Sequence, residues 1–305
     1  MNAADAHSAP PAAKPSGTVL YAMIAFMVVA WALNFIVGKI ALREIPALVL
    51  PGLRIALAAI LFIPIFLWDR RRTRHHFAWR DLPTLILVSV CGITLNQFFF
   101  IAGLYRTSVA HMAVFISITP VLVLLIAAAI GQERITAPKL CGMLVASAGV
   151  LSIELSNQGD AGIATPLGDL YAFLGTLSFS IYTVAGKGIS SRYGSIPMNT
   201  LAYAIGAVTL LPVAWSDRAS FHISTLSAAA WWSLIYMVVF GSVFAYLIYY
   251  YALVHIPASR VAAFTYAEPV LAAILGFALL GEPVTWILAL GGAMVLGGVW
   301  IAERA

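Results

Sequence analysis

Long apolar runs separated by short polar connections make up most of the chain. Ten of these runs have about 18–26 residues, enough for a helix to cross the roughly 30 Å hydrocarbon core of a bilayer. They cover approximately residues 19–40, 47–68, 82–104, 108–130, 138–155, 168–189, 198–215, 229–254, 258–280 and 284–301. Connections such as "GQERITAP" are so short that neighbouring helices must run antiparallel. The pattern predicts an all-α integral membrane protein with ten transmembrane helices.

Composition agrees with lipid as the solvent. The chain is 62% hydrophobic and only 10% charged, whereas a soluble domain has roughly a quarter of its residues charged. The formal net charge of +5 is expected in loops that face anionic lipid. It therefore predicts a bilayer as partner and gives no reason to expect binding to nucleic acid.

The basic residues predict the orientation. One side of the predicted membrane holds 12 of the 17, and the other side holds 4. The richer side contains Lys14, Arg70, Arg71, Arg72, Arg74, Arg80, Arg134, Lys139, Lys187, Arg192, Arg260 and Arg304. By the positive-inside rule this side is cytoplasmic, so both termini are predicted in the cytoplasm of an inner-membrane protein. Residues 1–17 lack the apolar core of a signal peptide and are predicted to form a disordered cytoplasmic tail.

The two halves of the chain resemble each other. "PVLVLLIAAAIGQERIT" begins at Pro120 and "PVLAAILGFALLGEPVT" begins at Pro269, 149 positions later. The same offset pairs Gly92 with Gly241, Gly142 with Gly291 and Gly149 with Gly298, and an offset of 148 pairs Gly38 with Gly186. Residues 18–157 and 165–303 are therefore predicted to be two repeats. Each holds five predicted spans, an odd number, so the second repeat enters the membrane inverted, as in many transporters.

These segments, together with "WALNFIVGK" and "LRIALAAILF" in the first half, resemble the paired repeats of EamA-type transporters of the drug/metabolite transporter superfamily. Within that family the chain is similar to exporters of aromatic and other amino acids. The resemblance implies ten helices in two inverted repeats around a central cavity. It also implies that helices 1, 3, 4, 6, 8 and 9 line the cavity and that helices 2, 5, 7 and 10 are peripheral.

Glu268 is a carboxylate near the middle of the predicted span 258–280. A charge at this depth is costly unless it is paired or faces water, and desolvation favours the neutral acid. Three roles stay open. Glu268 binds the ammonium group of a substrate, carries a proton, or forms a hydrogen bond between helices.

Pro120 and Pro269 predict kinks at matched positions, because each removes a backbone donor inside a span. Polar backbone at that depth is tolerated only against protein or a cavity. Ser117 and Thr119 precede the first proline, and Tyr266 and Glu268 precede the second. We expect a substrate site at these residues, with the two prolines as hinges.

Further polar and aromatic residues are candidates for contact with substrate. The amides Asn34, Asn96 and Gln97 are expected to bind either a substrate or another helix. The aromatic candidates are Trp31, Tyr182 and Tyr246, which suit an apolar or aromatic ligand. Arg54 lies inside the second predicted span, where it is expected to reach the headgroups or to pair with an acid in a loop.

The hypothesis is a secondary transporter that exports small metabolites, in particular aromatic, hydrophobic and other amino acids, by alternating access. The alternative is export of drugs, lipophilic cations or nucleobases by the same fold, and the remote alternative is an intramembrane enzyme. No HExxH or GxSxG motif is present, so the chain is not expected to be an enzyme. No nucleotide-binding loop or metal-ligand spacing predicts a cofactor or metal, and a monomer or weak homodimer is expected.

Overall fold

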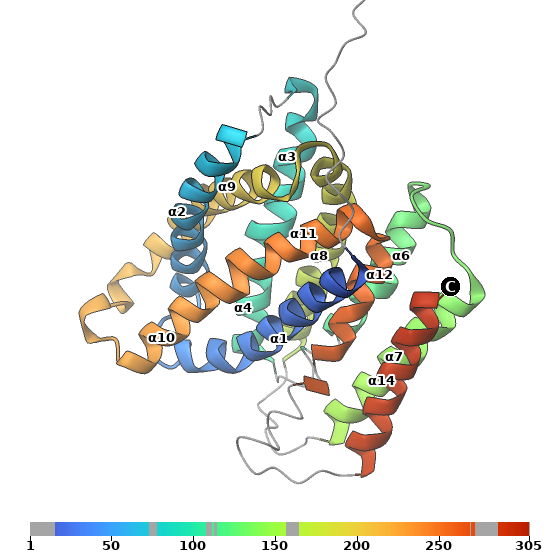
Figure 1. The fold of residues 1–305 in the computed structure, drawn as a ribbon. Helices are drawn as coiled ribbons and strands as arrows, with labels where there is room; N and C mark the ends of the chain where they lie inside the picture. Colours follow the sequence, from blue (N-terminus) through green and yellow to red (C-terminus); the bar gives the residue numbers. More distant parts are fainter. Residues whose placement is uncertain are drawn as a thin grey trace, which may run out of the picture.

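The fold is described by a computed structural model for residues 16–72, 78–107, 112, 115–156, 165–268, 270–271 and 286–304. These residues form helices and connections and contain no strand (Figure 1). In chain order the elements are α1 Gly17–Ala41, α2 Val49–Arg72, η1 Trp79–Asp81, α3 Leu82–Ser89, η2 Val90–Leu95, α4 Asn96–Arg106, α6 Thr119–Ala129, α7 Ala137–Ser156, α8 Pro166–Tyr193, α9 Ser195–Ser216, η4 Arg218–Ser220, η5 Ile223–Thr225, α10 Ala228–Tyr236, η6 Met237–Phe244, α11 Ala245–His255, α12 Ala258–Ala263, η7 Phe264–Tyr266 and α14 Trp286–Arg304.

Each of the ten predicted segments contains helical residues, which confirms the all-α prediction. Within the described ranges, five helices are long and apolar enough to cross a membrane: Gly17–Ala41, Val49–Arg71, Trp79–Arg106, Ser195–Ser216 and Ala228–His255. Two shorter apolar helices occupy Phe115–Ala129 and Ala137–Ile153. The predicted tail lies almost wholly outside the described residues, which begin at Ser16.

Local sequence signals explain where several helices begin and end. Ser16 caps α1 by accepting a hydrogen bond from the Val19 amide, and Thr165 caps α8 by accepting one from the Gly168 amide. Such side-chain caps satisfy backbone donors that have no partner inside the helix. Helix α8 stops at Gly194, whose φ of 87° is a conformation that favours glycine. Apolar runs therefore supply the helices, and caps and glycines limit them.

Two helix pairs on the outside of the protein consist of repeat-equivalent helices. Helix α7 packs along α14, and α2 packs along α9 (Figure 1). A Cβ placed on Gly142 would lie 2.6 Å from the Gly298 carbonyl oxygen, and one on Gly149 would lie 2.6 Å from the Gly291 carbonyl oxygen. As residue numbers rise along α7 they fall along α14, so the two helices are antiparallel. Glycines allow this close approach of backbones.

The helices nearer the centre pair across the two halves. Helix α1 packs on the column formed by α10, η6 and α11, and α8 packs on the column formed by α3, η2 and α4. Because α1 and α8 are repeat-equivalent, as are the two columns, these contacts are the same contact made twice. Helix α6 of the first half packs on α12 of the second half. A core of buried tyrosines, among them Tyr203, Tyr249 and Tyr250, fills the centre.

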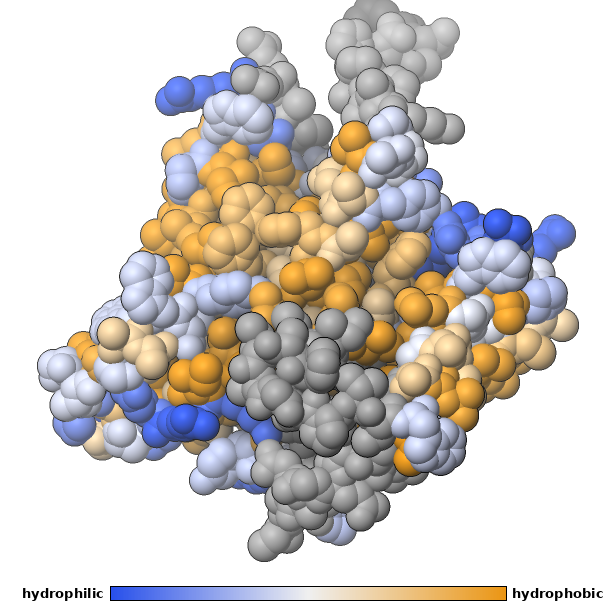
Figure 2. Space-filling model, turned by 60° about the horizontal axis from the view of Figure 1, so that its bottom comes forward, coloured by the Kyte–Doolittle hydropathy of each residue, from blue (hydrophilic) through white to orange (hydrophobic). Residues whose placement is uncertain are grey.

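The outer surface is apolar. In Figure 2 hydrophobic side chains gather across the middle of the visible face, and hydrophilic ones lie mainly toward its margins. Exposed residues include Ile60, Ile63, Leu67, Val208 and Leu296. An exposed apolar surface of this extent is unstable in water. It is the surface that a multi-pass membrane protein presents to lipid.

Candidate functional site

Both central columns change from α-helical to π-helical geometry at matched positions. The π segments are η2, which contains Gly92, and η6, which contains Gly241. Short π segments inside α-helices occur frequently at functional sites. A Cβ on Gly92 would lie 1.9 Å from the Tyr182 ring, and one on Gly241 would lie 2.4 Å from Asn34 Oδ1. Tyr182 is the repeat counterpart of Asn34. The π-segment glycine therefore packs against an aromatic ring at Gly92 and against an amide at Gly241.

A pocket lies between the halves next to these segments. About 720 Å³ of space is free of protein atoms there, counting the solvent at its open side. The pocket draws residues from α1, α2, α4, α6, α8 and α11, from η7 and from the helical turn after η7. Its lining residues are Trp31, Asn34, Arg54, Asn96, Gln97, Phe100, Met112, Ile116, Thr119, Ala172, Gly175, Thr176, Phe179, Tyr246, Thr265 and Glu268. Seven of the ten predicted substrate residues are therefore brought together.

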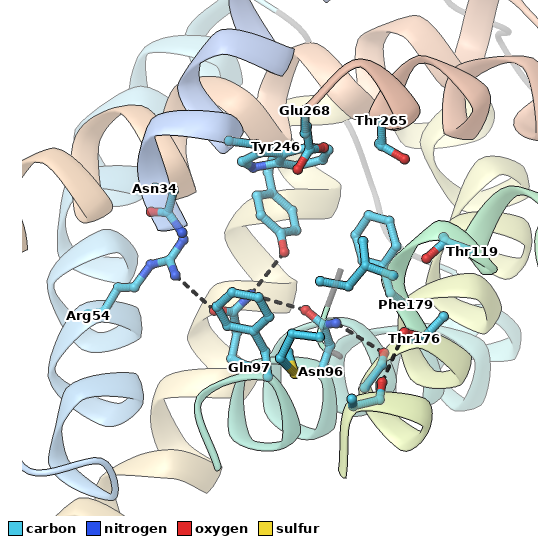
Figure 3. Close-up of a pocket in the computed structure, with 16 residues that line it drawn as sticks. Asn34, Arg54, Asn96, Gln97, Thr119, Thr176, Phe179, Tyr246, Thr265 and Glu268 are labelled. Atoms are coloured by element: carbon cyan, nitrogen blue, oxygen red, sulfur yellow. Dashed lines mark hydrogen bonds between the residues drawn. The ribbon is translucent and has the colours of Figure 1, made fainter. Parts of the chain in front are cut away.

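A chain of hydrogen bonds crosses one wall of the pocket (Figure 3). Arg54 Nη1 donates to Gln97 Oε1 over 3.1 Å, and Gln97 Nε2 donates to the Tyr246 hydroxyl over 3.0 Å. Asn96 Nδ2 donates to the Gly175 carbonyl over 3.1 Å. Gln97 and Tyr246 are repeat counterparts, 149 positions apart, so their bond joins the halves directly.

Two other polar groups in the pocket are not satisfied by the described part of the protein. Asn34 is only 7% exposed, and its Oδ1 has no hydrogen-bond partner there. Glu268 is also 7% exposed, and no hydrogen bond or ion pair joins it to another described residue. Figure 3 shows Glu268 beside Tyr246 and Thr265 and away from Arg54. Buried polar groups without partners are costly. Both residues line the pocket, where Glu268 can contact a ligand directly and Asn34 can do so once its amide oxygen turns away from Gly241.

Aromatic rings form the apolar part of the pocket. The Trp31 and Tyr246 ring centroids are 5.5 Å apart, and those of Trp31 and Phe179 are 6.0 Å apart, both in edge-to-face geometry. Trp31 Nε1 donates to the Gly241 carbonyl over 3.2 Å, which fixes the indole on the π segment. An apolar cavity with a few placed polar groups is the usual form of a small-molecule site.

Three predicted substrate residues do not line this pocket. The Tyr266 hydroxyl is 2.9 Å from Ser147 Oγ, which donates to the Ser117 carbonyl over 3.1 Å. Tyr182 packs on Gly92 and donates to Asn199 Oδ1 over 3.5 Å. As substrate contacts these three stay predictions.

Of the two predicted hinges, Pro120 and Pro269, the structure describes only the first. Helix α6 begins at Thr119, with Pro120 in its first turn, after a turn at Ile118 that separates it from helical residues 115–117. The helix is therefore interrupted directly before the first proline. Pro269 lies outside the described residues.

Arg54 was not among the predicted site residues, and its expected role was wrong. It is 2% exposed, and its Nε donates to Ser242 Oγ over 2.8 Å, so it reaches neither a headgroup nor a loop. Although α2 packs on the outside, as implied for the second helix, it also contributes Arg54 to the pocket lining, which the implied peripheral position did not include. A lone cation in an apolar span was the available signal, since ionisable residues inside membranes are usually functional.

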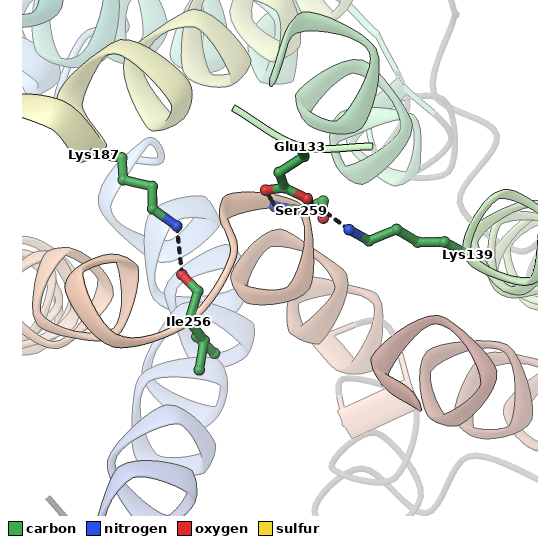
Figure 4. A network of polar contacts seen from close by, with 5 residues as sticks. All are labelled: Glu133, Lys139, Lys187, Ile256 and Ser259. Atoms are coloured by element: carbon green, nitrogen blue, oxygen red, sulfur yellow. Dashed lines mark hydrogen bonds and ion pairs between the residues drawn. The ribbon is translucent and has the colours of Figure 1, made fainter. Parts of the chain in front are cut away.

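A second polar network joins the halves at the end predicted to be cytoplasmic (Figure 4). Glu133 accepts hydrogen bonds from the Ser259 amide over 3.0 Å and from the Ser259 hydroxyl, and it pairs with Lys139 over 2.6 Å. Nearby, within the second half, Lys187 donates to the Ile256 carbonyl over 2.8 Å. Burial of Glu133 opposes its charge, but the hydrogen bonds from Lys139 and Ser259 outweigh burial and lower the pKa of the carboxyl.

Comparison with known proteins identifies a family and several relatives. The model of the EamA-like transporter family matches residues 18–155 and again residues 166–303. An uncharacterized transporter of Archaeoglobus fulgidus is 31% identical over 92% of this chain and 98% of its own length. A probable terminal-alkyne amino-acid exporter of Streptantibioticus cattleyicolor is 27% identical over 74% of both chains. A crystal structure with 17% sequence identity superposes with a TM-score of 0.77 over 95% of this chain and 98% of the other, which shows the shared fold.

Proposed function

Because the chain belongs to the EamA-like transporter family, we propose that it is a secondary carrier that exports amino acids, aromatic and hydrophobic ones among them. The family and the relatives are transporters rather than enzymes. One observation carries the substrate assignment. The pocket between the halves combines the carboxylate of Glu268, which has no partner among the described residues, with amides and aromatic rings. An ammonium group and an apolar side chain find partners in the same cavity. The Streptantibioticus relative, a probable terminal-alkyne amino-acid exporter, belongs to the same substrate class.

The proposed architecture is ten spans in two inverted repeats, residues 18–157 and 165–303, in the inner membrane with both termini cytoplasmic. The antiparallel packing of α7 on α14 supports the inversion, because equivalent helices of two repeats run in opposite directions only if one repeat is inverted. Helix α2 also runs antiparallel to α9. A Cβ on Gly52, early in α2, would meet Ala214 late in α9, and Gly206 approaches Ile55. The orientation rests on the distribution of basic residues.

Transport by alternating access follows from this architecture, since each half can take the conformation of the other. The hydrogen bonds from Ser259 to Glu133 tie the halves at the proposed cytoplasmic end. We therefore propose that the described conformation is closed toward the cytoplasm. The interruption before Pro120 is the proposed bending point, with Pro269 as its counterpart.

Efflux from proteoliposomes loaded with a labelled amino-acid mixture tests the function. We expect wild-type protein to release a defined subset that includes aromatic amino acids, and Glu268→Gln to lose most of that efflux. Asp217→Asn, at an acid outside the pocket in the segment between α9 and η4, is the matched control and is expected to behave as wild type. Release no faster than from empty vesicles contradicts amino-acid export.

Export of lipophilic cations is the second candidate, and the same pocket supports it. A carboxylate that shares a pocket with the aromatic rings of Trp31 and Tyr246 is a suitable environment for a cation. Adding lipophilic cations to the efflux assay separates the two candidates. Competition by such cations, without competition by amino acids, favours the second.

A further inference from the structure

Arg54 is a buried cation without a described carboxylate partner. Its guanidinium group donates to Ser242 Oγ and to Gln97 Oε1, which are both neutral acceptors. A guanidinium group has five N–H donors, so these two bonds leave donors unused. Taking an uncompensated cation out of water is expensive. Arg54 lines the pocket, so an anionic group of a ligand can reach it there.

Asn34 supplies the opposite capacity next to Arg54. A Cβ on Gly241 would lie 2.4 Å from Asn34 Oδ1 and 3.2 Å from Arg54 Nη2, so the two side chains flank the same backbone position. Asn34 Oδ1 has no hydrogen-bond partner in the described part of the chain. Figure 3 shows both side chains on the same side of the pocket. This oxygen is buried against Gly241, and a half-turn of the amide about its last torsion would bring it to face the pocket beside Arg54. An acceptor in that position, beside a cation, matches a molecule that carries a donor group and an anionic group close together.

We propose that Arg54 binds the carboxylate of the substrate, that Asn34 accepts a hydrogen bond from its ammonium group, and that the carrier selects zwitterions over cations. This inference rests on the proposed function, because it assigns the substrate class of the same pocket. Glu268, across the pocket from Arg54 (Figure 3), supplies the negative charge that balances the ligand's ammonium group. The rings of Trp31, Phe179 and Tyr246 receive the side chain.

The arrangement also explains the position of glycine at 241. Any side chain there would push against Asn34 and Arg54 and would change their spacing. At the equivalent place in the first half, Gly92 makes room for the Tyr182 ring. Gly241 therefore lies against a pair of proposed ligand-binding groups, whereas its counterpart Gly92 lies against a packed ring.

Binding of three ligands that share a phenyl ring tests the proposal: phenylalanine, phenethylamine and 3-phenylpropionate. Equilibrium binding to detergent-purified protein measures the site without transport. Wild type is expected to bind the zwitterion at least about tenfold more tightly than the amine or the acid, because each analogue leaves a buried charge unpaired. Arg54→Gln is expected to weaken the binding of phenylalanine and of 3-phenylpropionate by about tenfold or more. The affinity for phenethylamine is expected to stay unchanged or to rise.

Two further variants separate recognition from folding. Asn34→Leu removes an acceptor that has no described partner, so we expect unchanged thermal stability and weaker phenylalanine binding. Arg54→Lys keeps the charge and is expected to restore part of the binding that Arg54→Gln loses. Arg218→Gln, at an arginine that packs on Trp215 outside the pocket, is the control and should bind all three ligands as wild type does.

Several outcomes overturn the proposal. If Arg54→Gln weakens phenylalanine and phenethylamine by the same factor, Arg54 is only a brace between helices. If wild type binds phenethylamine as tightly as phenylalanine, the site does not select zwitterions. If Asn34→Leu binds phenylalanine normally, the amide is not a ligand. By contrast, tight zwitterion binding without efflux from proteoliposomes contradicts the proposed carrier and leaves the assignment of Arg54 intact.

Discussion

The seam between α7 and α14 and the pocket between the halves are built from the same repeat but differ in symmetry. In the seam, Gly142 meets Gly298 and Gly291 meets Gly149, so equivalent residues make equivalent contacts. In the pocket, equivalent positions carry different chemistry. Thr119 corresponds to Glu268, and Gln97 corresponds to Tyr246.

The difference separates packing from recognition. Two inverted copies need the same close helix contact on the outside, and small residues in both copies provide it. A ligand without two-fold symmetry needs different groups on its two sides, so the copies diverge where they face the pocket. Asymmetry within a symmetric frame is therefore the feature that marks the site in this molecule.

The largest effect is expected in the seam. Gly142→Ala and Gly291→Ala should each lower the free energy of unfolding by about 3 kcal/mol, the upper end for overpacking. In both cases the new methyl group meets backbone atoms, which cannot rotate away. The Cβ would lie 2.6 Å from a carbonyl oxygen at Gly142 and 2.8 Å from one at Gly291. Unfolding in mixed micelles measures the change.

The control for the seam is Gly297→Ala, in the same helix. A Cβ there meets nothing within 4 Å, so the substitution should leave stability unchanged or raise it by about 0.5–1 kcal/mol through backbone entropy. Equal losses at Gly297 and Gly291 contradict the idea that close contact requires glycine. Unequal losses at Gly142 and Gly291 contradict the symmetry of the seam.

A smaller and asymmetric effect is expected at the paired π segments. Gly92→Ala should lower the free energy of unfolding by about 2 kcal/mol, because its methyl group would overlap the buried Tyr182 ring. Gly241→Ala should cost less, about 1 kcal/mol, because the end of the Asn34 side chain can turn aside. It should, however, weaken phenylalanine binding about tenfold by disturbing Asn34 and Arg54.

Thermal melting and phenylalanine binding are the two measurements to make on both variants. A variant pair in which Gly92→Ala loses binding and Gly241→Ala loses stability would reverse the assignment of packing and recognition to the two halves. Gly188→Ala serves as the reference for adding a methyl group to a helix, since a Cβ at Gly188 meets nothing within 4 Å.

Much of the fold follows from the sequence because membrane helices satisfy their backbone within one segment. Apolar length alone therefore locates helical residues in all ten predicted segments. The offset between the halves also predicts which glycines correspond. It cannot predict that Gly142 contacts Gly298 rather than Gly291, because that depends on how the inverted copies dock.

The site was less predictable because side-chain direction is a three-dimensional property. Glu268 and the three amides could be predicted from their polarity at mid-span, and all four line the pocket. Arg54 could not be placed, because the same residue reaches a headgroup or a cavity depending on the face that α2 presents. The sequence also could not show that the Tyr182 ring packs on Gly92. The π geometry of η2 and η6 has no sequence signature beyond the paired glycines.

The smallest expected effect concerns Glu133, whose counterpart Glu282 lies outside the described residues. Hydrogen bonds from Lys139 and Ser259 lower the pKa of Glu133 despite its burial. A lowered pKa in the folded state stabilises the protein above the ordinary carboxyl value of 4.5, and this contribution is lost as pH falls below it. Glu133→Gln should therefore lower the free energy of unfolding by about 1 kcal/mol at pH 7. The difference from wild type should shrink between pH 5 and pH 3, and a difference that stays constant over this range contradicts a role for the charge.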